Sequence, residues 1–239
     1  MKSIGPTGVL SGIALTFNNS AIVKFRLMVA PQEHEYSVMG GVNRANVGRL
    51  LSLAASAISG GLVFTLLTVV DLAKRFGWNV NAPPTLMSLL GAGAIFGFLY
   101  WVLNKWAWKW PGIGLALKVP DISGTWGCTG ETLDSNGSAK YEWQAEVTIV
   151  QSWDKLRIRL TTETSGSSSI SAALAHDSVD GFVLLYHYRN DPKAGALNLA
   201  SHTGCAVMTI AKDLKSASGD YFNGRGRMTF GTMNWTKRN

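Results

Sequence analysis

The sequence predicts a membrane-anchored all-β protein, in which a two-helix transmembrane hairpin precedes an eight-stranded antiparallel β-barrel. Two uncharged apolar runs lie in the first half of the 239-residue chain, and short β-prone runs separated by turn signals fill the second half. The excess basic residues flank the apolar runs. We therefore divide the chain into residues 1–46 of unknown structure, a two-helix region at 47–110 and a barrel domain at 120–239.

Net charge separates the two halves. Residues 1–120 hold ten Lys or Arg and three Asp or Glu, which accounts for the whole net charge of +7, whereas residues 121–239 hold twelve of each. A protein that binds polymeric nucleic acid needs its basic excess on the folded domain that contacts phosphates. Because the excess lies beside apolar runs, the sequence indicates contacts with lipid headgroups and argues against polymeric nucleic acid as a partner.

The two apolar runs have the length that a bilayer requires. Residues 50–70 carry no charge, and at about 1.5 Å per residue they reach roughly 30 Å as a helix. A second uncharged run covers residues 86–103. Pro83 and Pro84 in the connection can end one helix and start the next. We predict two spans, because the alternative, a pair of buried core helices, rarely lacks a polar face over this length.

Residues beside the predicted spans indicate their orientation. Four basic residues lie on the side shared by both hairpin ends and two lie in the connecting loop: Arg44, Arg49, Lys105 and Lys109 against Lys74 and Arg75. The positive-inside rule then places both ends, and with them the barrel, in the cytoplasm. Trp106, Trp108 and Trp110 alternate with basic residues and predict an aromatic belt at the headgroups.

Small residues occur four positions apart in both predicted helices. Gly93 and Gly97 form one such step, and Ala57 and Gly61 form the other. These steps allow helix backbones to approach closely. They suit packing within the hairpin and packing between copies of the chain equally well.

Residues 1–46 contain a β-prone patch at 21–29 without a clear partner, so we assign them no structure. Met39 begins a stretch that runs directly into the first predicted span, which raises the hypothesis that translation starts there. Residues 1–17 hold one Lys and an apolar stretch broken by Gly and Pro. They lack a convincing cleavage site, so we predict no signal peptide.

Polar residues of the second half form no catalytic or metal-binding pattern. Cys128 and Cys205 lie far apart and indicate neither a disulfide framework nor a zinc site. His176, His187 and His202 show no metal-ligand spacing and no paired nucleophile. We therefore predict no catalytic residue, no metal and no cofactor.

Eight candidate strands follow the predicted helices, each bounded by turn residues. They cover residues 122–129, 141–150, 155–162, 168–175, 182–188, 202–211, 219–222 and 225–233. Antiparallel strands joined by hairpins close most simply into a barrel, which leaves no exposed edge. A barrel of eight strands is just wide enough to hold one small ligand.

Two motifs carry a resemblance to known families. Gly124-Thr-Trp126 is similar to the GxW opening of the lipocalins, in which the Trp closes one end of the barrel. The run Asp-Ile-Ser-Gly-Thr-Trp at 121–126 and the run Tyr-Phe-Asn-Gly-Arg-Gly-Arg-Met-Thr-Phe-Gly at 221–231, placed after two spans, resemble the two-transmembrane β-barrel effectors of bacterial cyclic-oligonucleotide antiphage signalling (CBASS), which are CD-NTase-associated membrane effectors. The resemblance covers about residues 45–239.

This resemblance implies a lipocalin-like barrel that binds a cyclic dinucleotide made by a partner nucleotidyltransferase. Binding is then expected to assemble a homo-oligomer and disrupt the bacterial inner membrane. A membrane-tethered carrier of an apolar small molecule or lipid is the alternative, and a wholly apolar barrel interior without convergent Arg would favour it. A membrane enzyme is disfavoured because the sequence offers neither paired carboxylates nor a His-supported nucleophile.

A cyclic dinucleotide site needs cationic or hydroxyl donors for two phosphodiesters and aromatic platforms for the bases. The arginines of the last predicted strand are candidates for phosphate, two tyrosines for base stacking, and the 165–169 hydroxyl cluster for further donors. For each candidate the alternative is structural: a solvated strand face, core packing, a turn, or a barrel plug. The candidate ligand-binding residues are Arg225, Arg227, Tyr186, Tyr188, Ser169 and Trp126.

Overall fold

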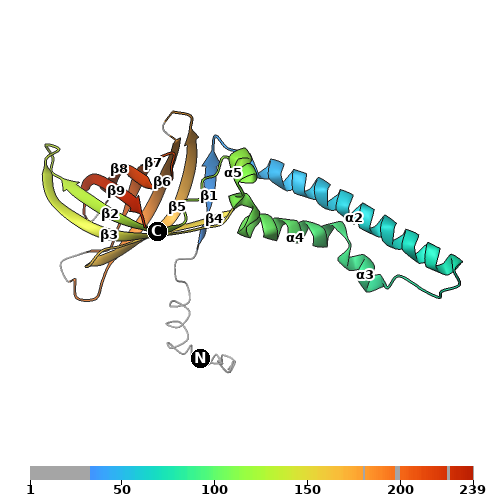
Figure 1. Ribbon diagram of the computed structural model, residues 1–239. Helices are drawn as coiled ribbons and strands as arrows, with labels where there is room; N and C mark the ends of the chain where they lie inside the picture. Colours follow the sequence, from blue (N-terminus) through green and yellow to red (C-terminus); the bar gives the residue numbers. More distant parts are fainter. Residues whose placement is uncertain (1–32, 180, 197–199, 225–226, 239) are drawn as a thin grey trace, which may run out of the picture. The chain divides into compact units, whose positions relative to one another are not determined.

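The computed structural model describes residues 33–179, 181–196, 200–224 and 227–238. Helices occupy much of the first part of these residues, and most strands of a closed, largely antiparallel barrel occupy the second, which confirms the predicted fold class (Figure 1). All elements described below belong to one unit, Glu33–Asn239.

Eight barrel strands follow one another in hairpin order, as predicted. They are β2 (Gly124–Leu133), β3 (Ala139–Gln151), β4 (Lys155–Thr161), β5 (Ser165–Asp177), β6 (Gly181–Pro192), β7 (His202–Ile210), β8 (Ser216–Asn223) and β9 (Phe230–Lys237). A further strand, β1 (His34–Met39), joins the barrel, whose order is β1-β4-β3-β2-β9-β8-β7-β6-β5. The described barrel therefore has nine strands, and the predicted count of eight was wrong by one.

Strand β1 is inserted between β4 and β5. These two strands pair directly only at residues 159–161 and 166–168. Beyond this point they separate, and β1 pairs antiparallel with β4 and parallel with β5. The sequence predicts no structure here because a short strand with distant partners carries no local turn signal. A chain that started at Met39 would lack this strand.

Ser169 stands where β4 and β5 separate. Its Oγ accepts a hydrogen bond from the Ile158 N–H at 2.9 Å and lies 2.7 Å from Nε2 of His34 in β1. We call the place where β4 and β5 separate the fork. The Ser169 hydroxyl thus gives the Ile158 N–H the hydrogen bond that a neighbouring strand would otherwise supply. Ser169 is buried and belongs to the barrel wall.

The last strand begins later than predicted, at Phe230, and the described residues 224 and 227–229 lie between β8 and β9, in the β8–β9 connection. The Asn223 N–H donates to the Thr229 carbonyl at 2.7 Å, and Met228 has a positive φ of 45°. The alternation of Arg with apolar residues is typical of a half-buried strand and led to the prediction of one. Arg227, however, precedes β9. Arg227 therefore extends from a loop, and Arg225 lies outside the described residues.

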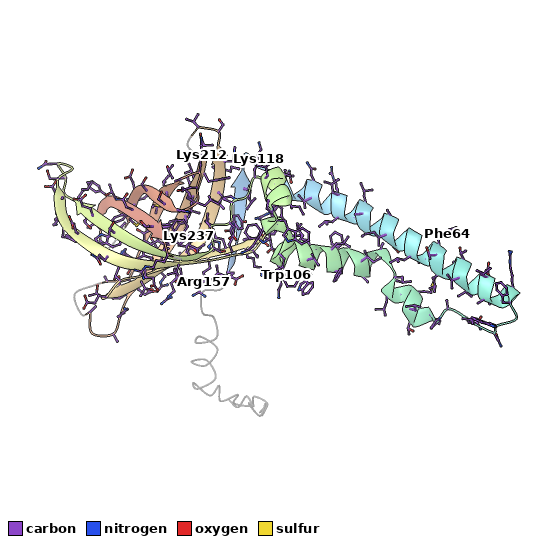
Figure 2. All side chains as sticks on the ribbon, viewed as in Figure 1. Phe64, Trp106, Lys118, Arg157, Lys212 and Lys237 are labelled. Carbon is purple, nitrogen blue, oxygen red and sulfur yellow. The ribbon has the colours of Figure 1, made fainter. Side chains whose placement is uncertain are left out.

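The helical region comprises α2 (Arg44–Arg75), α3 (Pro84–Leu89), α4 (Ala92–Lys105), a 3₁₀ turn (Ala107–Lys109) and α5 (Pro111–Leu117). Within the described residues, α2 is the one helix long and apolar enough to cross a membrane, with a mean hydropathy of 2.0. Apolar side chains such as Phe64, which is 73% exposed, project from α2 (Figure 2). The first predicted span is contained in this helix.

The second predicted span is divided at Leu90 and Gly91 into α3 and α4. Helix α4 has 14 residues, which at about 1.5 Å each is roughly 21 Å and shorter than the hydrocarbon core. The Ser59 hydroxyl of α2 donates to the Leu90 carbonyl at 2.5 Å. A polar side chain from a neighbouring helix thus satisfies a carbonyl at the break, as apolar surroundings require.

The predicted belt of three tryptophans is only partly correct. Trp106 and Trp110 are exposed, and Lys105 Nζ lies 5.8 Å from the ring centroid of Trp106. Trp108 is 0% exposed and packs within the hydrophobic core. Trp108 therefore belongs to the core and not to a surface belt.

The β3–β4 turn is joined directly to α4. The Trp153 N–H donates to the Asn104 carbonyl and the Asp154 N–H to Asn104 Oδ1, both at 3.2 Å. The Tyr100 hydroxyl donates to Asp154 Oδ2 at 2.8 Å. The C-terminal turns of α4 are therefore fixed to one hairpin of the barrel.

The same turn holds the first residue of α2. Arg44 Nη2 donates to the Trp153 carbonyl at 3.1 Å. The guanidinium carbon lies 4.7 Å from the ring centroid of Tyr36 in β1 and 5.6 Å from that of Trp153, distances typical of cation–π contacts. The start of α2 and the end of α4 are thus both held by the β3–β4 turn.

Replacing Ser169 with Ala should lower the free energy of unfolding by about 1–3 kcal/mol, because the buried Ile158 N–H loses its acceptor. Thermal or denaturant unfolding of the full chain in detergent measures the change. Ser171→Ala, at an exposed position of the same strand, is the control and should change stability little. Equal stabilities of the Ser169 variant and the parent would show that the fork does not depend on this hydroxyl.

Candidate ligand-binding site

The barrel is closed at the end that meets the helices. Trp126, Trp153 and Trp235 are each at most 2% exposed there. Trp126 Nε1 donates to the Ile122 carbonyl at 3.1 Å, and its ring centroid lies 6.4 Å from that of Trp235. Trp126 therefore plugs the barrel, as its resemblance to the lipocalin motif implies, and it does not line the cavity described next.

The opposite end of the barrel contains a cavity of about 350 Å³, within the usual range for small-ligand pockets. Its walls come from the strand ends beside the β2–β3, β4–β5, β6–β7 and β8–β9 connections. Aromatic side chains form much of the lining: Tyr141, Trp143, Tyr186, Tyr188 and Tyr221. Hydroxyl and amide groups surround them.

Two tyrosines of β6 form the floor of the cavity. The ring centroids of Tyr186 and Tyr188 lie 5.7 Å apart, and that of Tyr186 lies 6.1 Å from the Trp235 centroid. Burial raises the pKa of both phenols well above the ordinary value, so both hydroxyls stay protonated at neutral pH. The Tyr188 hydroxyl donates to Asn223 Oδ1 at 2.9 Å.

One wall of the cavity is an aromatic pair held by hydrogen bonds. The Tyr221 hydroxyl lies 2.7 Å from Thr132 Oγ1 and accepts from Trp143 Nε1 at 3.3 Å. The two rings meet edge to face with centroids 5.7 Å apart. Gly130 makes room for Trp143, because a Cβ at this position would lie 2.2 Å from the indole ring.

Arg227 is the cation of the described cavity lining. Its Nη2 donates to the Tyr141 hydroxyl at 3.1 Å, which joins the β8–β9 connection to β3. Burial raises the pKa of Tyr141, but hydrogen bonds with Thr132 and Arg227 lower it overall. Glu142 and Glu163 also line the cavity, so one cation and two carboxylates are present among the described lining residues.

The structure brings together three of the six predicted site residues: Tyr186, Tyr188 and Arg227. Ser169 lies in the fork between β4 and β5, and Trp126 lies in the closed end. Neither borders the cavity.

Three further aromatic residues line the cavity but were not predicted from the sequence: Tyr141, Trp143 and Tyr221. The alternation Tyr-x-Trp beside the β2–β3 turn could have indicated a shared inward face near the barrel mouth. Within the described residues, no three His, Cys, Asp or Glu side chains gather in a way that could hold a metal ion.

Comparison with known proteins matches both parts of this structure. A family model described as "Cap15, cyclic dinucleotide receptor domain" matches residues 117–237, which include β2–β9 and the cavity. The chain belongs to the Cap15 family. A second model, "Cap15, TM helices", matches residues 45–109, which include most of α2 and all of α3 and α4.

A curated relative supports the same assignment. The CD-NTase-associated protein 15 of Yersinia aleksiciae is 42% identical over 206 residues, which are 86% of this chain and 98% of the relative. The predicted membership among CD-NTase-associated CBASS membrane effectors is confirmed.

The two cysteines of this Cap15 protein should differ in reactivity. Cys128 is buried inside the barrel, and burial raises the pKa of its thiol to about 12. It therefore remains a protonated thiol at pH 9, where an unfolded cysteine is largely the reactive thiolate. Mass spectrometry after iodoacetamide treatment at pH 9 should show Cys205, which is partly exposed, modified first, and Cys128 modified only after denaturation. Equal rates in the native protein would contradict the packing around Cys128.

Proposed function

We propose that this Cap15 protein is an antiphage effector whose barrel cavity binds a cyclic dinucleotide, and that binding assembles the helices of several copies and disrupts the bacterial inner membrane. The observation that carries the proposal is the aromatic and polar cavity, which lies within the segment matched by the cyclic dinucleotide receptor domain. Rings suited to stacking and a cation suited to phosphate occur together there.

The cavity chemistry fits the two parts of such a ligand. Tyr186 and Tyr188 offer aromatic surface at the floor, where bases could stack. Arg227 at the β8–β9 connection offers a charge-assisted donor for a phosphodiester. Thr162 and Thr164 of the β4–β5 turn add hydroxyls to the lining.

The alternative, a carrier of apolar molecules, fits the lining less well. A wholly apolar interior would favour a carrier, but Asn190, Asn223 and Arg227 all border this cavity. Placing an apolar ligand against the Arg227 charge would remove water from that charge and would oppose the binding of a lipid.

We further propose a two-crossing topology in the inner membrane with the barrel in the cytoplasm. Support comes from the junction at the β3–β4 turn, where the start of α2 and the end of α4 meet. The basic residues that flank the helices, Arg49, Lys105 and Lys109 among them, lie near this junction in sequence, as the positive-inside rule requires.

Small residues of the helices are available for contacts between copies. Gly61, Gly93 and Gly97 are exposed, and a Cβ built at any of them would meet no atom of the described chain within 4 Å. Helices α2 and α4 contact each other within the chain, and Ser59 of α2 bonds to the Leu90 carbonyl between α3 and α4. The open space beside the three glycines supports association between copies as the use of these steps.

Replacing Arg227 with Ala should weaken cyclic dinucleotide binding at least tenfold, because a hydrogen bond to a charged group contributes roughly 1.5–3 kcal/mol. Titration calorimetry of the full chain in detergent with a panel of cyclic dinucleotides measures the affinity. Arg159→Ala is the matched control, since it removes the same charge from the outer barrel wall beside Ser168. Parental affinity in the Arg227 variant would remove this residue from the site, and failure of every ligand to bind the parent would overturn the proposed function.

Replacing Gly93 or Gly97 with Leu should abolish membrane damage and leave ligand affinity unchanged, because the added side chain prevents close helix contact. Entry of a membrane-impermeant dye into cells that also produce the partner nucleotidyltransferase reports damage. Gly93→Ala keeps a small residue and should retain activity. Dye entry at the parental level in the Leu variants would show that this step of α4 is not used in assembly.

A further inference from the structure

Strand β3 extends beyond β4, the strand that pairs with one of its two edges. Its residues 139–149 pair with β2, whereas β4 pairs only with residues 146–151. Residues 139–145 therefore have a neighbouring strand on one side alone among the described strands. The barrel wall has a notch at this place, between β3 and the β4–β5 turn.

The β3–β4 hairpin determines which main-chain groups face the notch. The Ser152 N–H donates to the Lys155 carbonyl at 2.8 Å, so even-numbered residues of β3 direct their N–H and C=O groups toward β4. Thr148 and Glu146 meet β4 residues in this register. Gln144 and Glu142 continue the series beyond the end of β4, and no described strand pairs with that edge.

These unpaired groups border the cavity. Glu142 and Gln144 belong to its lining, although both residues are exposed on the outer face of the barrel, where their side chains alternate with that of Trp143. Because their side chains face outward, we infer that their main-chain edge is the part that borders the cavity. Thr162 and Glu163 of the β4–β5 turn form the other side of the notch.

We propose that the free edge of β3 recognises a base of the cyclic dinucleotide through main-chain hydrogen bonds at Glu142 and Gln144. This inference rests on the proposed function of the cavity. Every nucleobase presents a donor beside an acceptor, and a strand edge offers the complementary N–H and C=O groups, as it does to an added peptide strand. The inward-facing ring of Trp143, between the two residues, offers aromatic surface beside the same edge.

A free strand edge can also pair with a second copy of the chain, but the residues here disfavour this. Lys140 and Glu142 place charged side chains along the edge, which is how natural proteins prevent edge-to-edge association. Glu142 and Gln144 of this edge, moreover, both line the cavity. A small polar ligand is the occupant that uses both features.

The first test changes the main chain at one position. Gln144→Pro removes the N–H that faces the notch, and proline is tolerated at such edge positions, whereas Gln144→Ala keeps the N–H and removes only the outward side chain. Calorimetry of the full chain in detergent with the cyclic dinucleotide that binds the parent best should show roughly tenfold weaker binding for the Pro variant, the usual scale for one lost hydrogen bond. The Ala variant should bind as the parent does.

A second measurement needs no variant, so it remains decisive where the Pro variant does not fold. Amide hydrogen exchange followed by NMR should show rapid exchange at Glu142 and Gln144 in the free protein and protection when the same ligand is added. The main-chain N–H of Trp143, which faces β2, should be protected from exchange in both states.

The outcomes separate the inference from the proposed function. Unchanged exchange at Glu142 and Gln144 in the presence of a bound ligand would overturn the inference alone, as would parental affinity in a folded Pro variant. Protection without ligand that grows with protein concentration would assign the edge to a second copy instead. Absence of any binding by the parent would contradict the proposed function itself.

Discussion

The hydrogen bonds between the β3–β4 turn and Asn104 are the interaction on which the two parts of this protein depend. They use the main chain of Trp153 and Asp154, while Arg44 at the start of α2 holds the Trp153 carbonyl. Both long helices are thus fixed to one hairpin. The strands of that hairpin extend to the cavity, where β3 forms one side of the notch and the β4–β5 turn, which follows β4, forms the other. The same two strands lead from the cavity to the β3–β4 turn that anchors the helices. A change in the separation of β3 and β4 at the cavity can therefore be transmitted along the main chain to that turn.

The two ends of the barrel differ in role, because one is filled by packed side chains and the other contains the cavity. Tryptophans fill the end beside the helices and leave no space for a ligand at Trp126. At the other end, most polar atoms of the cavity already have partners, as in the contacts of Tyr221 with Thr132 and of Tyr188 with Asn223. A ligand gains little by competing for satisfied groups, because each exchange of one hydrogen bond for another is nearly neutral. Aromatic faces, Arg227 and the unpaired edge of β3 are the features that can still contribute.

Local patterns in the sequence were sufficient for the main architecture. Uncharged runs predicted the helical region, and turn residues predicted eight strands to within a few positions, because hairpins carry their signals in adjacent residues. β1 was missed because its partners in β4 and β5 are distant in the chain. The site was found in part: Tyr186 and Tyr188 alternate on a predicted strand, but Trp143 and Tyr221 meet only through strand register. Arg227 was assigned to a strand because its neighbours alternate in polarity, although it belongs to a loop.

The insertion of β1 also constrains how the chain is threaded. β1 precedes α2 and β2 follows α4, yet both strands belong to one barrel and must lie in the same compartment. If α2 crosses a bilayer, the chain must therefore cross it again before β2, and the number of crossings would then be even whatever the flanking charges are. The partners of β1 are also synthesised long after it, and closing so long a loop costs entropy. In a chain that crosses a bilayer in α2, the barrel can therefore close only after the segment between β1 and β2 has returned to the compartment of β1.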